Sequence, residues 1–209
     1  MIYYLKYQKK LLNNHIKMSE KILVITGDFA EDYEVMVPVQ VLQINGYEVD
    51  VVCPDKKKDD TIQTAVHDFS PLYQFFVETK GHAFKLNKTF DEVKVEEYVG
   101  LYLPGGRAPE YLRYNKKVME MVEYFLKNKK PVCAVCHALL LLAQKPCDAY
   151  IKDKNITSFP SVRAEVECAG VKYVEKDEAV TDGNIVTGQS YMSHVPMLQQ
   201  FLKVLEAAK

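Results

Sequence analysis

Cys136 and His137 stand side by side within the most apolar stretch of the chain, PVCAVCHALLLLAQ at residues 131–144. A thiolate is a strong nucleophile, and an adjacent imidazole can carry protons for it. The apolar residues before Cys136 indicate a buried strand, and the leucines after it indicate a helix. Cys136 would then lie on a sharp strand-to-helix turn, the place of the nucleophile in many hydrolases. This context favours a reactive thiol over an inert core cysteine, which is the alternative.

Glycines at the end of a second strand could assist such a thiol. The segment VGLYLPGG at residues 99–106 is typical of a buried strand that stops at Gly105 and Gly106. Open α/β sheets place their sites in the crevice at the carboxyl ends of the strands. Backbone N–H groups of a glycine turn can stabilise an oxyanion there. Together with the N-terminus of the following helix, these donors predict a depressed pKa for the Cys136 thiol.

Alternating strands and helices must position these residues. Buried strands are predicted at 21–28, 47–54, 99–106 and 131–135, shorter ones at 156–160 and within 179–188, and helices at 31–46, 108–130, 137–144 and 197–209. The pattern predicts one α/β domain over residues 18–209, with a mostly parallel sheet and helices on both faces. Residues 55–91 are polar and irregular, with weak strand signals, and so long a segment usually carries function or an interface.

Composition narrows the classes of protein further. The 209 residues carry 27 basic and 28 acidic side chains, and this balance disfavours binding to nucleic acid or to a membrane surface. The five cysteines indicate a reducing compartment rather than a disulfide framework, so we expect a cytoplasmic protein. No apolar run approaches the length of a membrane span. Residues 1–17 contain four lysines and no acid, and we interpret them as an extension outside the domain.

Three segments taken together resemble the landmark motifs of the ThiJ/PfpI family, the DJ-1-like group. They are GDFAEDYEVMVP at 27–38, LPGGRAPEYL at 103–112 and AVCHA at 134–138. Two further segments, at 52–69 and 79–93, resemble the plant two-domain members studied as glutathione-independent glyoxalases. The resemblance covers residues 21–205. It implies the flavodoxin-like three-layer sandwich of class I glutamine amidotransferases, with a nucleophile elbow at Cys136.

The resemblance also implies roles for individual residues. Cys136 matches the family's nucleophile, and Glu34 matches the carboxylic acid that hydrogen-bonds to it. Glu34 would favour the thiolate only when it is protonated, because an ionised carboxylate raises a neighbouring thiol's pKa. His137 matches the histidine that follows the nucleophile, and Gly105 and Gly106 match the glycines on the oxyanion side.

Further matches concern the edge of the pocket. Glu110 matches a glutamate that a neighbouring subunit supplies in the peptidase-like members. Ala138 stands where the family usually has glycine, and its methyl group is expected close to the pocket. His194 matches a histidine near the site of plant-type members, so it is a secondary pocket candidate. The spacing of His67 and His82 fixes no metal site, so we expect no metal. The reaction that the resemblance implies needs no other cofactor.

The resemblance implies an enzyme that converts 2-oxoaldehydes such as methylglyoxal and glyoxal to 2-hydroxy acids through a cysteine hemithioacetal. A cysteine peptidase or amidase, or a protein deglycase, could use the same residues. A non-enzymatic oxidative-stress sensor or chaperone could instead use Cys136 as an oxidisable thiol. Redox pairing of Cys133 with Cys136 is disfavoured, because three residues of strand span roughly 10 Å and a disulfide needs Cα atoms within about 7 Å. We expect a homodimer or larger homo-oligomer with residues 107–114 in its interface.

Overall fold

The fold is built on a six-stranded sheet, seen in a computed structural model that describes residues 20–69, 72, 74–175 and 178–209. The strand order is β2 (Glu48–Val52), β1 (Lys21–Ile25), β5 (Tyr98–Leu103), β6 (Val132–Val135), β10 (Ile185–Gly188) and β9 (Val180–Asp182). Neighbouring strands are parallel except for the antiparallel pair of β9 and β10. The predicted extension at residues 1–17 lies outside the described residues.

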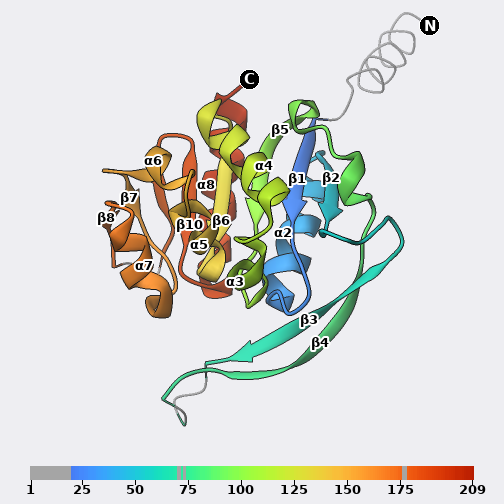
Figure 1. Ribbon diagram of the computed structural model, residues 1–209, viewed down its shortest axis with the longest axis horizontal. Helices are drawn as coiled ribbons and strands as arrows, with labels where there is room; N and C mark the ends of the chain where they lie inside the picture. Colours follow the sequence, from blue (N-terminus) through green and yellow to red (C-terminus); the bar gives the residue numbers. More distant parts are fainter. Residues whose placement is uncertain (1–19, 70–71, 73, 176–177) are drawn as a thin grey trace, which may run out of the picture.

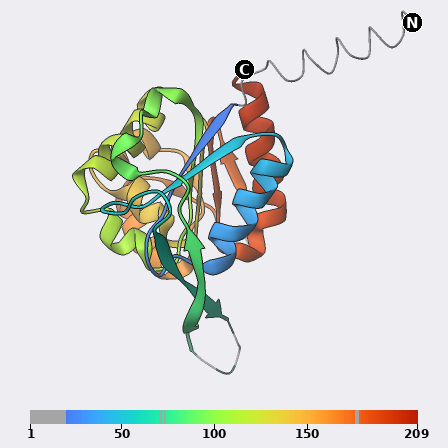
Figure 2. The same cartoon turned by 90° about the vertical axis from the view of Figure 1, so that its right-hand side faces the viewer.

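Helices cover both faces of this sheet (Figures 1 and 2). Helices α2 (Asp32–Ile44) and α8 (His194–Ala207) pack on one face, and α3 (Ala108–Leu112), α4 (Lys116–Lys127) and α5 (Leu139–Ala143) pack on the other. The short elements α6 (Asp148–Ile151), α7 (Arg163–Cys168) and the strands β7 (Asn155–Ile156) and β8 (Lys172–Tyr173) follow α5 along the chain. The predicted three-layer α/β arrangement is confirmed.

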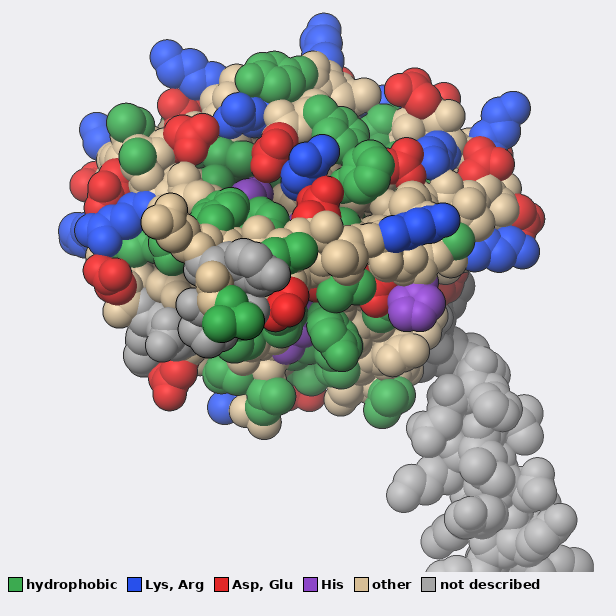
Figure 3. Space-filling view, turned by 90° about the horizontal axis from the view of Figure 1, so that it is seen from below, with side chains coloured by type: hydrophobic (Ala, Val, Ile, Leu, Met, Phe, Trp, Pro, Cys, Tyr) green, Lys and Arg blue, Asp and Glu red, His purple; other side chains and the backbone are tan. Residues whose placement is uncertain are grey.

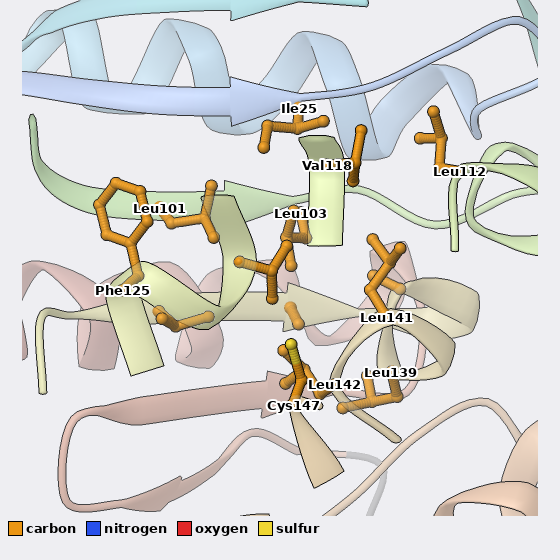
Figure 4. Close-up of a cluster of buried hydrophobic side chains, with 14 of the residues drawn as sticks. Ile25, Leu101, Leu103, Leu112, Val118, Phe125, Leu139, Leu141, Leu142 and Cys147 are labelled. Carbon is orange, nitrogen blue, oxygen red and sulfur yellow. The ribbon is translucent and has the colours of Figure 1, made fainter. Parts of the chain in front are cut away.

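The apolar runs of the strands have a simple cause in this arrangement. Leu23 and Ile25 of β1 point to the core beneath α4 and α5, whereas Ile22 and Val24 point to the core beneath α2 and α8. Because side chains alternate along a strand, a strand covered on both faces must be apolar throughout. Figure 4 shows the first of these cores, where β5 side chains meet Phe125 of α4 and leucines of α5.

Residues 55–91 form the element that the sequence predicted least well. Strands β3 (Thr61–Asp68) and β4 (Val77–Lys85) pair antiparallel in a long hairpin that projects from the carboxyl-end edge of the main sheet (Figures 1 and 2). Most β4 side chains are exposed or only partly buried, so β4 carries little of the apolar pattern that reveals a strand. The hairpin is anchored at Asp32, whose carboxylate accepts a hydrogen bond from the His82 backbone at 3.0 Å.

Most predicted bounds differ from the structure by a few residues, and three differences stand out. The helix predicted over 108–130 is broken, because the Asn115 side chain accepts a hydrogen bond from Val118 N–H at 3.1 Å and caps a separate α4. The strand predicted over 156–160 is reduced to the two residues of β7. The last helix begins at His194 and accommodates Pro196 in its first turn. Among the described residues, no helix is long and apolar enough to cross a membrane.

Candidate active site

Cys136 lies where β6 ends and the chain turns into a helix. The backbone at Cys136 has a φ of 59°, a left-handed conformation that side-chain-bearing residues rarely adopt. A single 3₁₀ turn, Cys136–Ala138, then leads into α5. Such strain costs about 1–3 kcal/mol and is concentrated at functional sites. The turn holds the thiol at the carboxyl end of β6, with only 5% of the residue exposed.

Glu34 and Gly105 pack directly against this cysteine. Glu34 lies in the first turn of α2 with no exposed surface, and its Oε2 accepts a hydrogen bond from Gly105 N–H at 2.8 Å. A Cβ at Gly105 would lie 2.5 Å from Cys136 Cβ and 2.6 Å from Glu34 Oε2, so only glycine fits there. Gly105 was predicted to face an oxyanion. Its N–H instead holds the Glu34 carboxyl.

Two other backbone N–H groups remain for an oxyanion. The backbone N–H groups of Gly106 and His137 donate hydrogen bonds to the Cys136 sulfur, and these bonds favour a lower pKa for the thiol. Gly106 has a φ of 71°, and a Cβ there would lie 2.6 Å from Phe29 O, so the turn requires glycine. The His137 N–H was not among the predicted donors. Its signal was available, since the residue after the nucleophile supplies such a donor in other elbows.

The protonation states of Cys136 and Glu34 are set mainly by burial. Burial raises the pKa of the Glu34 carboxyl well above its usual range, and the nearby Glu31 charge raises it further. Burial also raises the pKa of the Cys136 thiol, and an ionised Glu34 would add to that shift. The expected depression of the thiol pKa is therefore wrong for this enclosed site, because loss of water outweighs the backbone donors.

His137 is held by groups on both sides of its ring. Its Nε2 lies 2.9 Å from Ser161 Oγ, and its Nδ1 lies 3.3 Å from Glu110 Oε1. Burial lowers the pKa of His137, although Glu110 opposes that shift. The imidazole is therefore neutral at neutral pH and able to accept a proton. Glu110 was expected from a neighbouring subunit, but here the Glu110 of the same chain makes this contact.

A cavity of about 520 Å³ opens beside His137. Its wall includes Phe75, Phe76, Glu78, Arg107, Glu110 and His137. Figure 3 views this end of the molecule, where acidic, basic and apolar side chains are mixed. The volume is far larger than a three-carbon aldehyde needs, so the cavity can also admit a larger molecule.

The β3–β4 hairpin and the loops after β7 and β10 close the site with aromatic rings. The Phe159 ring centroid lies 5.5 Å from that of His137, and Phe76 lies 6.4 Å from it. Phe69 stacks on Phe159 at 5.5 Å and on Tyr191 at 5.2 Å. The sequence does not reveal this cluster, because its members are far apart along the chain and come together only on folding. The neighbouring cavity wall carries Glu78, whose carboxylate lies 2.9 Å from His67 Nε2.

Of the predicted site residues, His137 and Glu110 line this cavity, whereas the others do not: Glu34, Gly105, Gly106, Cys136, Ala138 and His194. Ala138 is fully buried in the hydrophobic core beneath α4 and α5, so the prediction that its methyl group borders the pocket is wrong. His194 is buried at the start of α8, where burial lowers its pKa to about 4, and it does not line the cavity. His82 pairs with Asp32 at 3.1 Å. Among the described residues, no three His, Cys, Asp or Glu side chains form a group suited to a metal ion.

Known proteins resemble this chain in sequence. It matches the DJ-1/PfpI family over residues 20–204. Protein DJ-1 homolog D of Arabidopsis thaliana is 43% identical over 190 residues, which is 90% of this chain and 48% of the plant protein. The chain thus spans about half the length of that relative. Deglycase PfpI of Pyrococcus furiosus is 31% identical over 186 residues, or 89% of this chain and 99% of the archaeal protein.

Solved structures resemble the chain in fold. The ThiJ/PfpI domain protein from Brachyspira murdochii superposes with a TM-score of 0.72 at 19% identity, covering 90% of this chain and 96% of that one. DJ-1 from Schizosaccharomyces pombe gives a TM-score of 0.70 at 19% identity with the same coverage of both chains, 90% and 96%. The sheet and its flanking helices thus have the same arrangement as in these solved structures.

Proposed function

Because the chain belongs to the DJ-1/PfpI family, we propose that it is a cofactor-independent glyoxalase acting on 2-oxoaldehydes such as methylglyoxal and glyoxal. One observation carries the proposal: a strained Cys136 is packed against a buried Glu34, with two backbone N–H groups on the thiol side. These are the nucleophile, the acid and the oxyanion donors that the reaction requires. The resemblance to plant-type members supports the same chemistry.

The first step joins the thiol to the aldehyde. Cys136 Sγ attacks the aldehyde carbon, a C–S bond forms, and the thiol proton is transferred to the aldehyde oxygen to give a hemithioacetal. The neutral His137 imidazole can carry that proton, and the Gly106 and His137 N–H groups can stabilise charge on the oxygen. Because the thiol is protonated at neutral pH, proton transfer must accompany the attack.

The second step moves hydrogen between the two carbons of the substrate. One proton leaves the sulfur-bearing carbon and another leaves its hydroxyl group. The electron pair of the broken C–H bond moves toward the adjacent carbonyl through an enediol, and that carbonyl gains both protons. In methylglyoxal this ketone becomes a secondary alcohol, and the sulfur-bearing carbon becomes a thioester carbonyl. Glu34 and His137 are the proton carriers. Water then hydrolyses the thioester, which restores the thiol and releases the 2-hydroxy acid. Substrate and water balance every atom and electron.

The test is lactate formation from methylglyoxal without glutathione. The purified chain is expected to form lactate, Cys136→Ala is expected to form none, and the buried Cys133→Ala is the matched thiol control that keeps most of the activity. Absence of lactate with the unaltered chain, or equal loss in the two variants, would refute the proposal.

A deglycase is the second candidate, and two observations favour it. The cavity of about 520 Å³ exceeds what methylglyoxal fills, and a protein named as a deglycase aligns over 99% of its own length. Preformed methylglyoxal adducts of N-acetylcysteine or N-acetyllysine separate the two. A deglycase consumes the adducts faster than they release free methylglyoxal, whereas a glyoxalase is limited by that release.

We propose a homodimer or larger homo-oligomer in the cytoplasm, with residues 107–114 at the interface. The Glu110 contact within one chain means that His137 does not need a partner subunit for this carboxylate. Light scattering of the purified chain measures the mass directly.

A further inference from the structure

We propose that Glu31, three residues before Glu34, is a positioning residue that keeps the Glu34 carboxyl protonated through a buried pair of carboxyl groups. The inference rests on the proposed function, because it assigns a proton state to the acid of that reaction. Glu31 acts through Glu34 and is not expected to touch the substrate.

The two carboxyl groups have matching surroundings. Neither residue has any exposed surface. Glu31 caps the start of α2, and its Oε2 accepts a hydrogen bond from Glu34 N–H at 2.8 Å. Glu34 Oε2 accepts one from Gly105 N–H, also at 2.8 Å. The Oε1 atom of each residue is buried and makes no hydrogen bond of good geometry to a described residue. Each carboxyl thus interacts with backbone N–H groups, those of His67 and Tyr33 as well as Glu34 at Glu31, and that of Tyr191 as well as Gly105 at Glu34, and keeps one Oε1 without a hydrogen bond of good geometry to a described residue.

An unpartnered buried carboxyl oxygen is costly when charged. A protonated oxygen carries no charge, so burial favours the acid form. Two carboxyl groups that share a buried site also resist a second negative charge, because each charge raises the other's pKa. The pair therefore retains at least one proton over a wide range of pH.

The groups around Glu31 decide which member gives up its proton first. The titratable groups that interact with it are Asp32 and Glu34 on α2, Tyr102 on β5, Cys136 at the elbow and Tyr191 after β10. Backbone N–H groups of Glu34, His67 and Tyr33 stabilise the Glu31 anion, and burial raises its pKa to about 7. The pKa of Glu34 is raised well above its usual range, partly by the Glu31 charge. Above neutral pH, Glu31 is the anion and Glu34 is the acid.

A charged Glu31 and a protonated Glu34 suit the proposed reaction. A protonated Glu34 can donate a hydrogen bond to the reacting sulfur or oxygen, whereas an ionised Glu34 repels a thiolate. Removing the Glu31 charge lets Glu34 ionise at lower pH. The loss of activity on the alkaline side of the pH–rate profile should then move to lower pH.

The experiment compares the pH–rate profiles of Glu31→Gln and the unaltered chain, with methylglyoxal as substrate. The glutamine amide oxygen can still accept the hydrogen bond from Glu34 N–H, so the helix cap is kept. We expect the alkaline limb of kcat/KM to move down by about one pH unit, which is about a tenfold loss on that limb, with activity at about pH 6 within roughly twofold. Glu31→Asp retains a carboxyl cap and should keep the original profile. Glu120→Gln, on an exposed carboxyl of α4, controls for lost charge.

Two outcomes would overturn the proposal. An unmoved alkaline limb would mean that Glu31 does not influence Glu34, and an equal loss at every pH would mean that Glu31 serves only as a cap. A substrate-free measurement separates this failure from failure of the proposed function. Above neutral pH, where Glu31 is ionised, infrared spectra should show the band of a buried protonated carboxyl that is absent in Glu34→Gln, and in Glu31→Gln the Glu34 band should disappear at lower pH than in the unaltered chain. If that shift occurs without lactate formation, the carboxyl pair stands and the glyoxalase assignment falls.

Discussion

His194 should make the stability of this protein fall steeply in mild acid. The residue begins α8 with 6% of its surface exposed, and its Nε2 has no hydrogen-bond partner among the described residues. Burial lowers its pKa from 6.5 to about 4. Its position at a helix N-terminus is also unfavourable for a positive charge.

The sign and size of the effect follow from linkage. Between the two pKa values, the unfolded chain binds a proton at His194 and the folded chain does not, so the unfolding free energy rises with pH. The stabilisation is fully present above the unfolded value of 6.5 and is lost as pH falls toward about 4. At about 1.4 kcal/mol per pKa unit, the whole window corresponds to about 3 kcal/mol. Roughly 2 kcal/mol of it should be lost between about pH 7.5 and about pH 5.

Urea unfolding at these two pH values measures the effect. The unfolding free energy of the unaltered chain should fall by about 2 kcal/mol more than that of His194→Leu, which has no group to titrate at this position. Val195→Ala, on an exposed neighbour in the same helix, controls for disturbance of the helix start. Equal pH dependence in the unaltered chain and His194→Leu would refute the account of His194 as a buried neutral group.

Three further predictions concern the site. Iodoacetamide at about pH 7 should alkylate the exposed Cys168 before Cys136, because burial raises the pKa of the Cys136 thiol. Mass spectrometry of the labelled peptides measures the order of reaction, and labelling of Cys136 first would contradict this prediction. Glu110→Gln should lower kcat by roughly tenfold, a small part of what a positioned proton carrier contributes, because Glu110 orients His137, and activity per chain should not change on dilution. A steep loss on dilution would instead show that a partner chain completes the site. Gly105→Ala should abolish lactate formation, because the new Cβ would lie 2.5 Å from Cys136 Cβ. The crowding should also cost about 1–3 kcal/mol of stability, measured by thermal melting. An active variant would contradict this account of Gly105.

Local sequence was enough to predict the main elements and the strand-to-helix turn that holds Cys136. The apolar strands around residues 21–25 and 132–135 are covered on both faces, so their composition reveals them without knowledge of their neighbours. The elbow was equally accessible, because a strand, a cysteine and a helix follow one another along the chain at Cys136. The hairpin at residues 61–85 was not predicted as such, because it lies outside the main sheet and much of β4 is exposed.

Contacts between residues far apart in the sequence, and the pKa values that depend on them, were decided by tertiary structure alone. Folding places Glu110 of the same chain beside His137 and assigns the Gly105 N–H to Glu34. The direction of the Cys136 pKa could not be predicted from the helix N-terminus, because it depends on how completely the fold removes water from the thiol and its carboxyl neighbours. Sequence determines which ionisable groups are present. Their charges depend on burial and on distances that exist only in the folded chain.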